Sequence, residues 1–286
     1  MKLLHSKIFR LVSTLALFLP AAIPWQRFAY AQYVTNTDYL CNSVMHFETL
    51  HRLGSRAGRL IMYPSEFSLD DDSPENRLLI QARDCYGVKL LPVAVQKRGS
   101  ADDTWSEGYT KLLAFNQTQY DRLLVLDSDS MIRQTMDELF LLHNCPMAAP
   151  RSYWEPGTHR IMDAIENAGE NAYDMEIANN LYRDSAFVIP HRPYGLLTGE
   201  FRSKDHAPYL GNRKEQWDPV KALSEAKFLH YADWPLPKQR LQPSCEIDPR
   251  TGYEDDCHAR EIWRGLYKTS EQQRLDICNM TLKGTP

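Results

Sequence analysis

The chain has 286 residues, of which 43% are hydrophobic and 24% are charged, and its formal net charge is −4. This composition is ordinary for a globular protein and supports one sizeable core, so the length indicates one domain, or one domain with an extension. Because the charge balance is slightly acidic and no long basic block occurs, we expect no nucleic-acid partner.

The first 32 residues differ from the rest. Lys2, Lys7 and Arg10 precede a charge-free stretch over 11–25, which predicts a signal peptide or a signal-anchor. Its 15 residues are short for a full membrane span of about 20. The sequence Ala29-Tyr30-Ala31 resembles a cleavage site, so removal of the segment is an alternative to anchoring, and a buried N-terminal helix is another.

Basic residues ahead of an apolar segment favour a cytosolic N-terminus, with the remainder of the chain in the lumen. We therefore predict a type II membrane-anchored protein of the Golgi or the secretory-pathway lumen, which is secreted if the segment is cleaved. Two N-glycosylation sequons, which begin at Asn116 and Asn279, agree with this location but arise often by chance.

From about residue 33 onward, strand patterns alternate with helix patterns, which is typical of a parallel α/β sheet. Strands are expected at 33–35, 59–63, 88–95, 122–126, 147–150 and 227–230. Helices are expected at 41–53, 75–86, 105–115, 136–142 and 173–182. The segment 192–212 is rich in Pro, Gly and charge, and it predicts a loop.

These patterns predict three parts: a signal-anchor or signal peptide over 1–32, an α/β domain over 33–242, and a cysteine-containing C-terminal tail over 243–286. The tail is Pro-rich and acidic, and we expect its cysteines to form a stabilising crosslink: Cys245, Cys257 and Cys278. An even total of six cysteines in a secretory chain allows disulfides. No C-x-x-C pair occurs, which disfavours a zinc ribbon.

The most informative motif is an apolar run, Leu123 to Leu126, that leads directly into Asp127, Ser128 and Asp129. A short continuous apolar run predicts a strand buried on both faces, and ligands bind beyond the carboxyl ends of such strands. Carboxylate oxygens favour Mg²⁺ or Mn²⁺, and a divalent ion favours a diphosphate. By itself the tripeptide is weak, because acidic pairs also end strands as loop or cap residues.

Four stretches match a known family: 33–44, 111–130, 173–182 and 230–238. On these stretches the chain resembles the family 8 glycosyltransferases, the glycogenin-like group, and looks most similar to fungal Golgi members that transfer N-acetylglucosamine or glucose. The resemblance implies the GT-A fold, an α/β fold with a Rossmann-like, mostly parallel sheet and flanking helices. It also implies a metal-dependent, retaining enzyme that moves a sugar from a UDP-sugar to a glycan or glycoprotein acceptor.

The resemblance further implies a metal site, in which Asp127, Asp129 and His230 hold Mn²⁺ or Mg²⁺. An imidazole suits Mn²⁺ as a borderline ligand. Ser128 lies between the two carboxylates and is assigned with them to the donor site. A histidine in an ordinary surface loop is the alternative interpretation of His230.

The remaining implied roles concern the UDP-sugar. Lys238 would contact the pyrophosphate as a point charge. Thr35 and Tyr39 would contact the base or ribose, with Tyr39 stacking on uracil. Lys111 would face the donor sugar or phosphate, and Asp174 would lie near the donor sugar and the acceptor. Lys111 and Asp174 are the predicted catalytic residues.

Each of these residues also has a structural explanation. Lys111 on a helix is commonly a solvated residue, and Tyr39 could be partly packed. Asp174 could simply begin a helix, where acidic residues are favoured. The resemblance, rather than the spacing of these residues, favours the functional interpretation.

The sequence departs from the family at two places. Residues 151–161 run almost directly into 164–167, so that a strand of about ten residues is missing there. The loop after His230 ends in Lys238-Gln239-Arg240, where the family usually has Lys-Pro-Trp. An alternative function is therefore a catalytically impaired lumenal relative that only binds UDP-sugar or only keeps the fold.

A phosphatase with an Asp-x-Asp-x-Thr motif is a third hypothesis. In that class Thr or Val follows at the fifth position and the motif usually opens the domain. Here the fifth residue is Met131, and three predicted strand–helix units come first. The phosphatase pattern is therefore a poor match.

Overall fold

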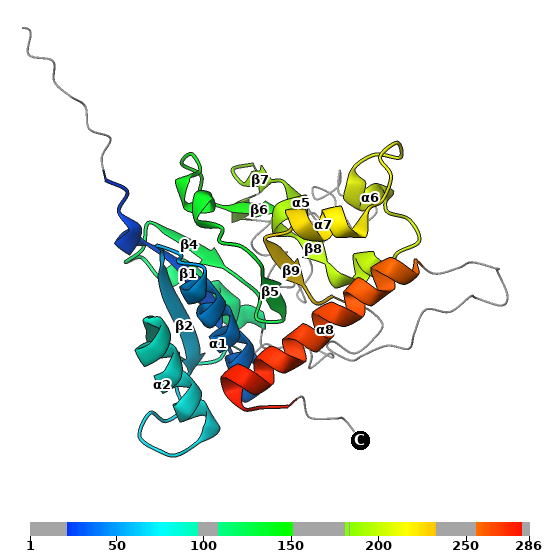
Figure 1. Cartoon of the computed structure of the whole chain (residues 1–286). Helices are drawn as coiled ribbons and strands as arrows, with labels where there is room; N and C mark the ends of the chain where they lie inside the picture. Colours follow the sequence, from blue (N-terminus) through cyan, green and yellow to red (C-terminus); the bar gives the residue numbers. More distant parts are fainter. Residues whose placement is uncertain (1–21, 97–107, 151–180, 183, 233–255, 282–286) are drawn as a thin grey trace, which may run out of the picture.

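The computed structural model describes residues 22–96, 108–150, 181–182, 184–232 and 256–281. Its centre is a four-stranded parallel sheet in the order β3-β2-β1-β4 (Figure 1). The strands are β1 (Phe28–Tyr33), β2 (Gly58–Pro64), β3 (Val88–Val93) and β4 (Arg122–Val125). The α/β fold with a parallel sheet and flanking helices, predicted from the alternating patterns, is confirmed.

Two helices connect the first three strands: α1 (Thr37–Arg52) and α2 (Pro74–Tyr86). The side chain of Asn36 caps α1 by accepting a hydrogen bond from the amide of Tyr39, at 3.0 Å. This cap explains why α1 begins four residues before the helix predicted from Cys41 onward. α2 ends at Gly87, whose φ of 65° is a left-handed conformation that favours glycine.

Both faces of β1 are buried. On one face, Tyr30 packs with α1 residues such as Phe47 and Leu50. On the opposite face, Ala29 and Ala31 pack with Leu60 and Tyr120. The run Leu123 to Leu126 packs on both faces of the sheet, as expected, but less fully: β4 is the edge strand of the sheet as described and its residues are half-buried, whereas Leu126 is buried.

The first strand begins at Phe28, whereas the sequence predicted it at 33–35. Its alternating alanines and tyrosines fit between two packed layers, although they resemble the end of a targeting segment. The possible cleavage sequence Ala29-Tyr30-Ala31 is completely buried, and cleavage there would remove most of a central strand. Most of the charge-free stretch falls within residues 1–21, which lie outside the described residues. Among the described residues, no helix has the length and apolar character to cross a bilayer.

Two connectors predicted as α-helices are 3₁₀ helices: η2 (Gly108–Asn116) and η3 (Asp137–Leu141). Both lie in connections next to strands, where tight 3₁₀ turns are common. The helix predicted at 173–182 falls mostly outside the described residues.

A second, smaller sheet lies beside the first, with the order β5-β9-β8 (Figure 1). It comprises β5 (Ser130–Ile132), β8 (Leu196–Leu197) and β9 (Phe228–His230), and β5 runs antiparallel to β9. A parallel pair, β6 (Ala148–Pro150) and β7 (Phe187–Ile189), completes the strands of the described residues. The strands predicted near 147–150 and 227–230 are thus confirmed.

The predicted loop at 192–212 instead contains several short elements. These are β8, α5 (His191–Tyr194), η5 (Thr198–Arg202) and α6 (Ala207–Leu210), and α7 (Pro219–Glu225) follows them. Elements this short leave no periodic pattern in the sequence, which is why the prediction was wrong.

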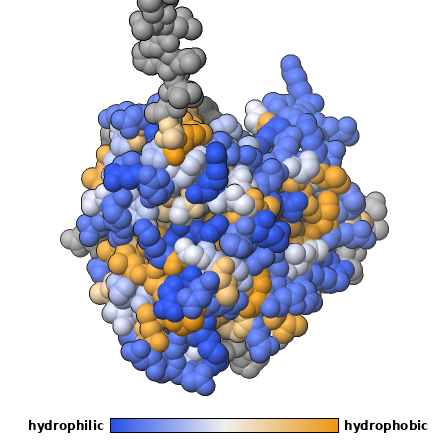
Figure 2. All heavy atoms as spheres, turned by 60° about the vertical axis from the view of Figure 1, so that its left-hand side comes forward, coloured by the Kyte–Doolittle hydropathy of each residue, from blue (hydrophilic) through white to orange (hydrophobic). Residues whose placement is uncertain are grey.

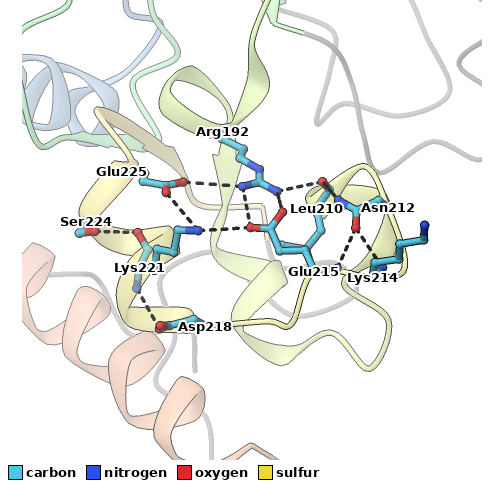
Figure 3. A network of polar contacts seen from close by, with 9 residues as sticks. All are labelled: Arg192, Leu210, Asn212, Lys214, Glu215, Asp218, Lys221, Ser224 and Glu225. Carbon is cyan, nitrogen blue, oxygen red and sulfur yellow. Dashed lines mark hydrogen bonds and ion pairs between the residues drawn. The ribbon is translucent and has the colours of Figure 1, made fainter.

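Charged side chains join these short elements (Figure 3). Arg192 of α5 donates to Glu215 at 2.6 Å, and Lys221 of α7 lies 3.4 Å from the same carboxylate. The hydrogen bond from Arg192 lowers the pKa of Glu215 to about 2. The network links α5 to α7 just before β9 and so supports the start of that strand.

The segment expected as a tail contains a long helix, α8 (Cys257–Cys278), which crosses one side of the molecule and packs against α1, α7 and η5 (Figure 1). Trp263, Leu266 and Tyr267 are buried in a cluster that includes Leu229 and Tyr231. This helix is not evident from the sequence pattern, because charged residues separate its few apolar positions. α8 is part of the core.

A disulfide fastens α8 to α1. Cys41 and Cys278 are bonded, with their Cα atoms 5.9 Å apart. Cys257 is also disulfide-bonded, whereas Cys85 and Cys145 are free.

Asn116 and Asn279, which begin the two sequons, are both exposed. The face in Figure 2 is largely hydrophilic, with apolar residues in several separate areas.

We predict that replacing both Cys41 and Cys278 with alanine lowers the free energy of unfolding by about 2–4 kcal/mol, because the bond closes a loop of 237 residues in the unfolded chain. Denaturant unfolding measures the change. The matched control replaces Cys85 and Cys145, which are free, and should change stability little. Equal unfolding midpoints for the two double variants would contradict the crosslink.

Candidate functional site

The candidate site forms where two neighbouring strands end. β1 and β4 are parallel, so their carboxyl ends meet at the same edge of the sheet. The amide of Leu126 donates to the carbonyl of Ala31 at 3.1 Å, and this hydrogen bond holds the ends of β1 and β4 together at this edge. Thr35 and Asp127 therefore lie in loops that leave the sheet on the same side, where open α/β folds bind ligands.

The second sheet brings His230 to this edge. Ser130 of β5 pairs with His230 of β9, although 100 residues separate them in the chain. The imidazole Nε2 of His230 lies 3.1 Å from Asp129 Oδ1, and the next amide, of Tyr231, donates to the carbonyl of Asp129 at 3.0 Å. The Asp129 side chain is only 11% exposed, so this pair is largely shielded from water.

Asp127 has a cationic neighbour. Lys111 of η2 places its Nζ 2.7 Å from Asp127 Oδ1, and the two side chains are 20% and 32% exposed. The same ammonium lies 5.9 Å from the centre of the Tyr33 ring. Lys111 is therefore not a solvated helix residue but a partner of the acidic loop, residues Asp127 to Asp129, and it offsets the repulsion between the two carboxylates.

The other predicted residues divide into two groups. Ser128 is buried within the loop, while Thr35 is half-buried and Tyr39 is exposed at the first turn of α1. Asp174 and Lys238 lie outside the described residues. So does the segment near 151–165, where the sequence was predicted to lack a strand. The structure thus pairs Lys111 with Asp127 and His230 with Asp129, and it places Thr35 in the loop after β1 and Tyr39 in the first turn of α1.

Beneath the acidic loop is a buried polar network that the sequence analysis missed. His46 of α1 lies with Nε2 2.9 Å from the carbonyl of Ser130 and Nδ1 2.7 Å from the side-chain amide of Gln32. The Ser43 hydroxyl donates to Gln32 at 2.9 Å. Nothing in the sequence marks His46, because its partners Gln32 and Ser130 come from two separate strands, β1 and β5. The network fixes the chain directly after Asp129.

These side chains fit a divalent cation chemically. Two carboxylates and an imidazole are a ligand set suited to Mn²⁺. Two adjacent ligands of an octahedral ion at about 2.1 Å lie about 3 Å apart, close to the 3.1 Å between Asp129 and His230. Across the described residues, however, no three His, Cys, Asp or Glu side chains already converge as a metal site, and Asp127 is paired with Lys111.

The phosphatase hypothesis fails at the fifth position. Met131 lies in β5, is 9% exposed and packs in an apolar cluster with Leu196 and Leu229. It offers no hydroxyl to the acidic loop, and a threonine there would put its hydroxyl into that apolar cluster.

We predict that His46 makes the fold sensitive to acid. Burial lowers the pKa of His46 to about 4, below the 6.5 of the unfolded chain. The unfolded state therefore binds the proton first, and stability is lost as the pH falls from about 6.5 to 4, by about 3 kcal/mol for this residue alone.

Chemical unfolding between pH 4 and 7 measures the effect. His46→Gln should flatten the dependence of stability on pH, whereas the same change at the exposed His258 should leave the slope unchanged. Parallel pH profiles for wild type and His46→Gln would show that the burial of His46 has no such consequence.

Two curated relatives with the same name are similar to this chain over most of its length. No protein-family model matches the chain. It is 49% identical to "Glucose N-acetyltransferase 1" of Gibberella zeae, over 90% of this chain and 63% of the relative. It is 40% identical to the protein of the same name from Aspergillus fumigatus, over 88% of this chain and 77% of the relative. The chain thus spans just under two thirds of the length of the first of these relatives.

Solved glycosyltransferases have a similar fold at low sequence identity. The chain matches the glycosyltransferase GlyE of Streptococcus pneumoniae with a TM-score of 0.51 and 18% identity, over 89% of this chain and 62% of GlyE. It matches the galactosyltransferase LgtC, solved with donor and acceptor sugar analogs, with a TM-score of 0.51 and 14% identity, over 84% of this chain and 95% of LgtC.

The likeness to these two structures establishes the fold. Each has a TM-score just above 0.5, and the arrangement of parallel strands and flanking helices described above agrees with a GT-A glycosyltransferase fold. The relative from Aspergillus fumigatus, matched over most of both chains, establishes the family. This chain belongs to the glucose N-acetyltransferase 1 family.

Proposed function

We propose that the protein is a metal-dependent glycosyltransferase that takes N-acetylglucosamine from a UDP-linked donor and passes it to a glycan or protein acceptor. The observation that carries the proposal is the pairing of Asp129 with His230 at 3.1 Å, beside Asp127, at the carboxyl edge of the sheet. An acidic site at this position suits a cation that in turn binds a diphosphate.

The name of the relatives favours N-acetylglucosamine over glucose as the transferred sugar. Glucose carries hydroxyl groups and no amine, so it has no nitrogen that could receive an acetyl group. Transfer of a glucose unit that already bears an N-acetyl group satisfies both the name and the glycosyltransferase fold. Glucose is the second candidate donor sugar, as the family 8 resemblance implies.

Different residues of the chain would contact different parts of the donor. Asp127, Asp129 and His230 would hold Mn²⁺ or Mg²⁺, and a bound divalent ion offsets the charge of a leaving diphosphate. Lys111 adds a second positive charge at the same place, because its ammonium already lies 2.7 Å from Asp127. Thr35 and Tyr39 border the site on the β1 side, where we propose that they contact the ribose and uracil.

Retention of the anomeric configuration and the roles of Asp174 and Lys238 follow from the family 8 resemblance alone. A carboxylate such as Asp174 can stabilise positive charge that develops at the anomeric carbon. Lys238 would neutralise the diphosphate together with the ion. We retain both as proposals for residues outside those that the structure describes.

We further propose that the protein works in the Golgi or another secretory-pathway compartment, attached through its N-terminal segment. The Cys41–Cys278 disulfide and the bonded Cys257 support this location, because such bonds persist in oxidising compartments. The exposure of Asn116 and Asn279 is compatible with glycosylation in the lumen.

We expect UDP binding to require Mn²⁺ and to depend on Asp129. Asp129→Asn should weaken UDP binding in Mn²⁺ about tenfold or more, because a charge-assisted contact contributes about 1.5–3 kcal/mol. Calorimetric titration of UDP, with Mn²⁺ and with a chelator, measures the change. The matched control is Asp84→Asn on α2, a residue whose side chain is 54% exposed, and it should bind UDP as wild type does.

A second measurement decides between an enzyme and a binding-only relative. It follows the release of UDP when the wild-type protein is given UDP-N-acetylglucosamine or UDP-glucose separately. Release of UDP with Mn²⁺ from the first donor supports the enzyme. UDP binding without any turnover would favour the catalytically impaired relative. Equal UDP binding by wild type and Asp129→Asn, with or without Mn²⁺, would refute the metal-dependent site.

A further inference from the structure

The C-terminal helix α8 contacts the first turns of α1, the helix that carries Tyr39. Arg274, which is completely buried, donates from Nη1 to Asn42 Oδ1 at 2.6 Å and to the carbonyl of Asp38 at 3.2 Å. Its Nη2 donates to Asp38 Oδ1 at 2.7 Å. Tyr39, the residue proposed to stack on uracil, lies between these two partners in the first turns of α1.

The same helix contacts the site on the metal side by different means. Tyr231, which directly follows His230, is buried against Tyr267 with 5.0 Å between the ring centres. Its hydroxyl donates to the carbonyl of Leu266 at 3.2 Å. This side is held by apolar packing and by the pairing of β5 with β9, so it does not depend on Arg274.

Burial of the charged guanidinium of Arg274 is energetically unfavourable. Burial lowers its pKa, while the carboxylate of Asp38 raises it. A cation in the interior persists only where partners compensate for the lost water, and all three of the hydrogen bonds above go to α1. Replacing a buried ion pair together with its partners by apolar side chains is often neutral or stabilising, so a buried arginine is weak evidence of a role in stability alone.

We propose that Arg274 is a positioning residue for the nucleotide end of the donor site. It fixes the first turns of α1, and through them the direction in which Tyr39 projects from the carboxyl edge of the sheet. The Cys41–Cys278 bond, which joins the same two helices, holds α8 in place for this contact. The proposal rests on the proposed UDP site, and it assigns to α8 control of the base end but not of the diphosphate end.

The experiment compares two ligands on the full chain in Mn²⁺: UDP, which carries the base, and inorganic pyrophosphate, which does not. Arg274→Met should weaken UDP binding about fivefold or more and change pyrophosphate binding less than twofold. Lys268→Met is the matched control, since it also removes a cation from α8 but at an exposed position, and it should change neither affinity.

A milder variant keeps the test valid if Arg274→Met does not fold. Asp38→Asn weakens the same contact from the α1 side, at a side chain that is 50% exposed, and should produce a smaller loss in the same direction, for UDP only. Arg274→Lys, which retains the charge, should recover part of the UDP affinity.

The outcomes separate this proposal from the function on which it rests. Equal losses for UDP and pyrophosphate would mean that Arg274 supports the fold in general, and would overturn the positioning role. Unchanged UDP affinity in both Arg274→Met and Asp38→Asn would overturn it as well. Wild-type protein that binds pyrophosphate but not UDP would overturn the proposed function, and this inference with it.

Discussion

The pairing of β5 with β9 is the constraint on which the candidate site depends. It places His230 opposite Ser130, so that an imidazole from late in the chain lies 3.1 Å from a carboxylate that follows β4. Without this pairing, Asp127 and Asp129 are only an acidic turn at the end of an edge strand. With it, three potential cation ligands come from the loop between β4 and β5 and from β9, at the edge where open α/β folds bind ligands.

Collecting negative charge at a half-buried edge is unfavourable, and two neighbouring side chains offset that cost while a third fixes the backbone of the loop. Lys111 neutralises Asp127, and His230 contacts Asp129. His46, kept neutral by burial, holds the carbonyl of Ser130 and so fixes the backbone that leaves the acidic loop. A bound divalent ion would replace some of these contacts, which suits a site that must take up and release a charged ligand.

The sequence was sufficient for the parts of this account that depend on local patterns. The parallel sheet, the strands near Gly58–Pro64 and Phe228–His230, and the acidic loop after β4 all followed from short apolar runs and their flanking turns. What it did not predict depends on distant contacts. The start of β1, the burial of α8, and the roles of His46 and Arg274 each arise from partners far away in the chain, which leave no periodic pattern.

The central claim is that a diphosphate binds here through a divalent ion held by the acidic loop and β9. The most direct measurement is the affinity of the wild-type chain for UDP and for UMP, each with Mn²⁺ and with a chelator. We predict that UDP binds much more tightly than UMP in Mn²⁺ and that the chelator removes the difference. Equal affinities for the two nucleotides, unchanged by the chelator, would contradict it.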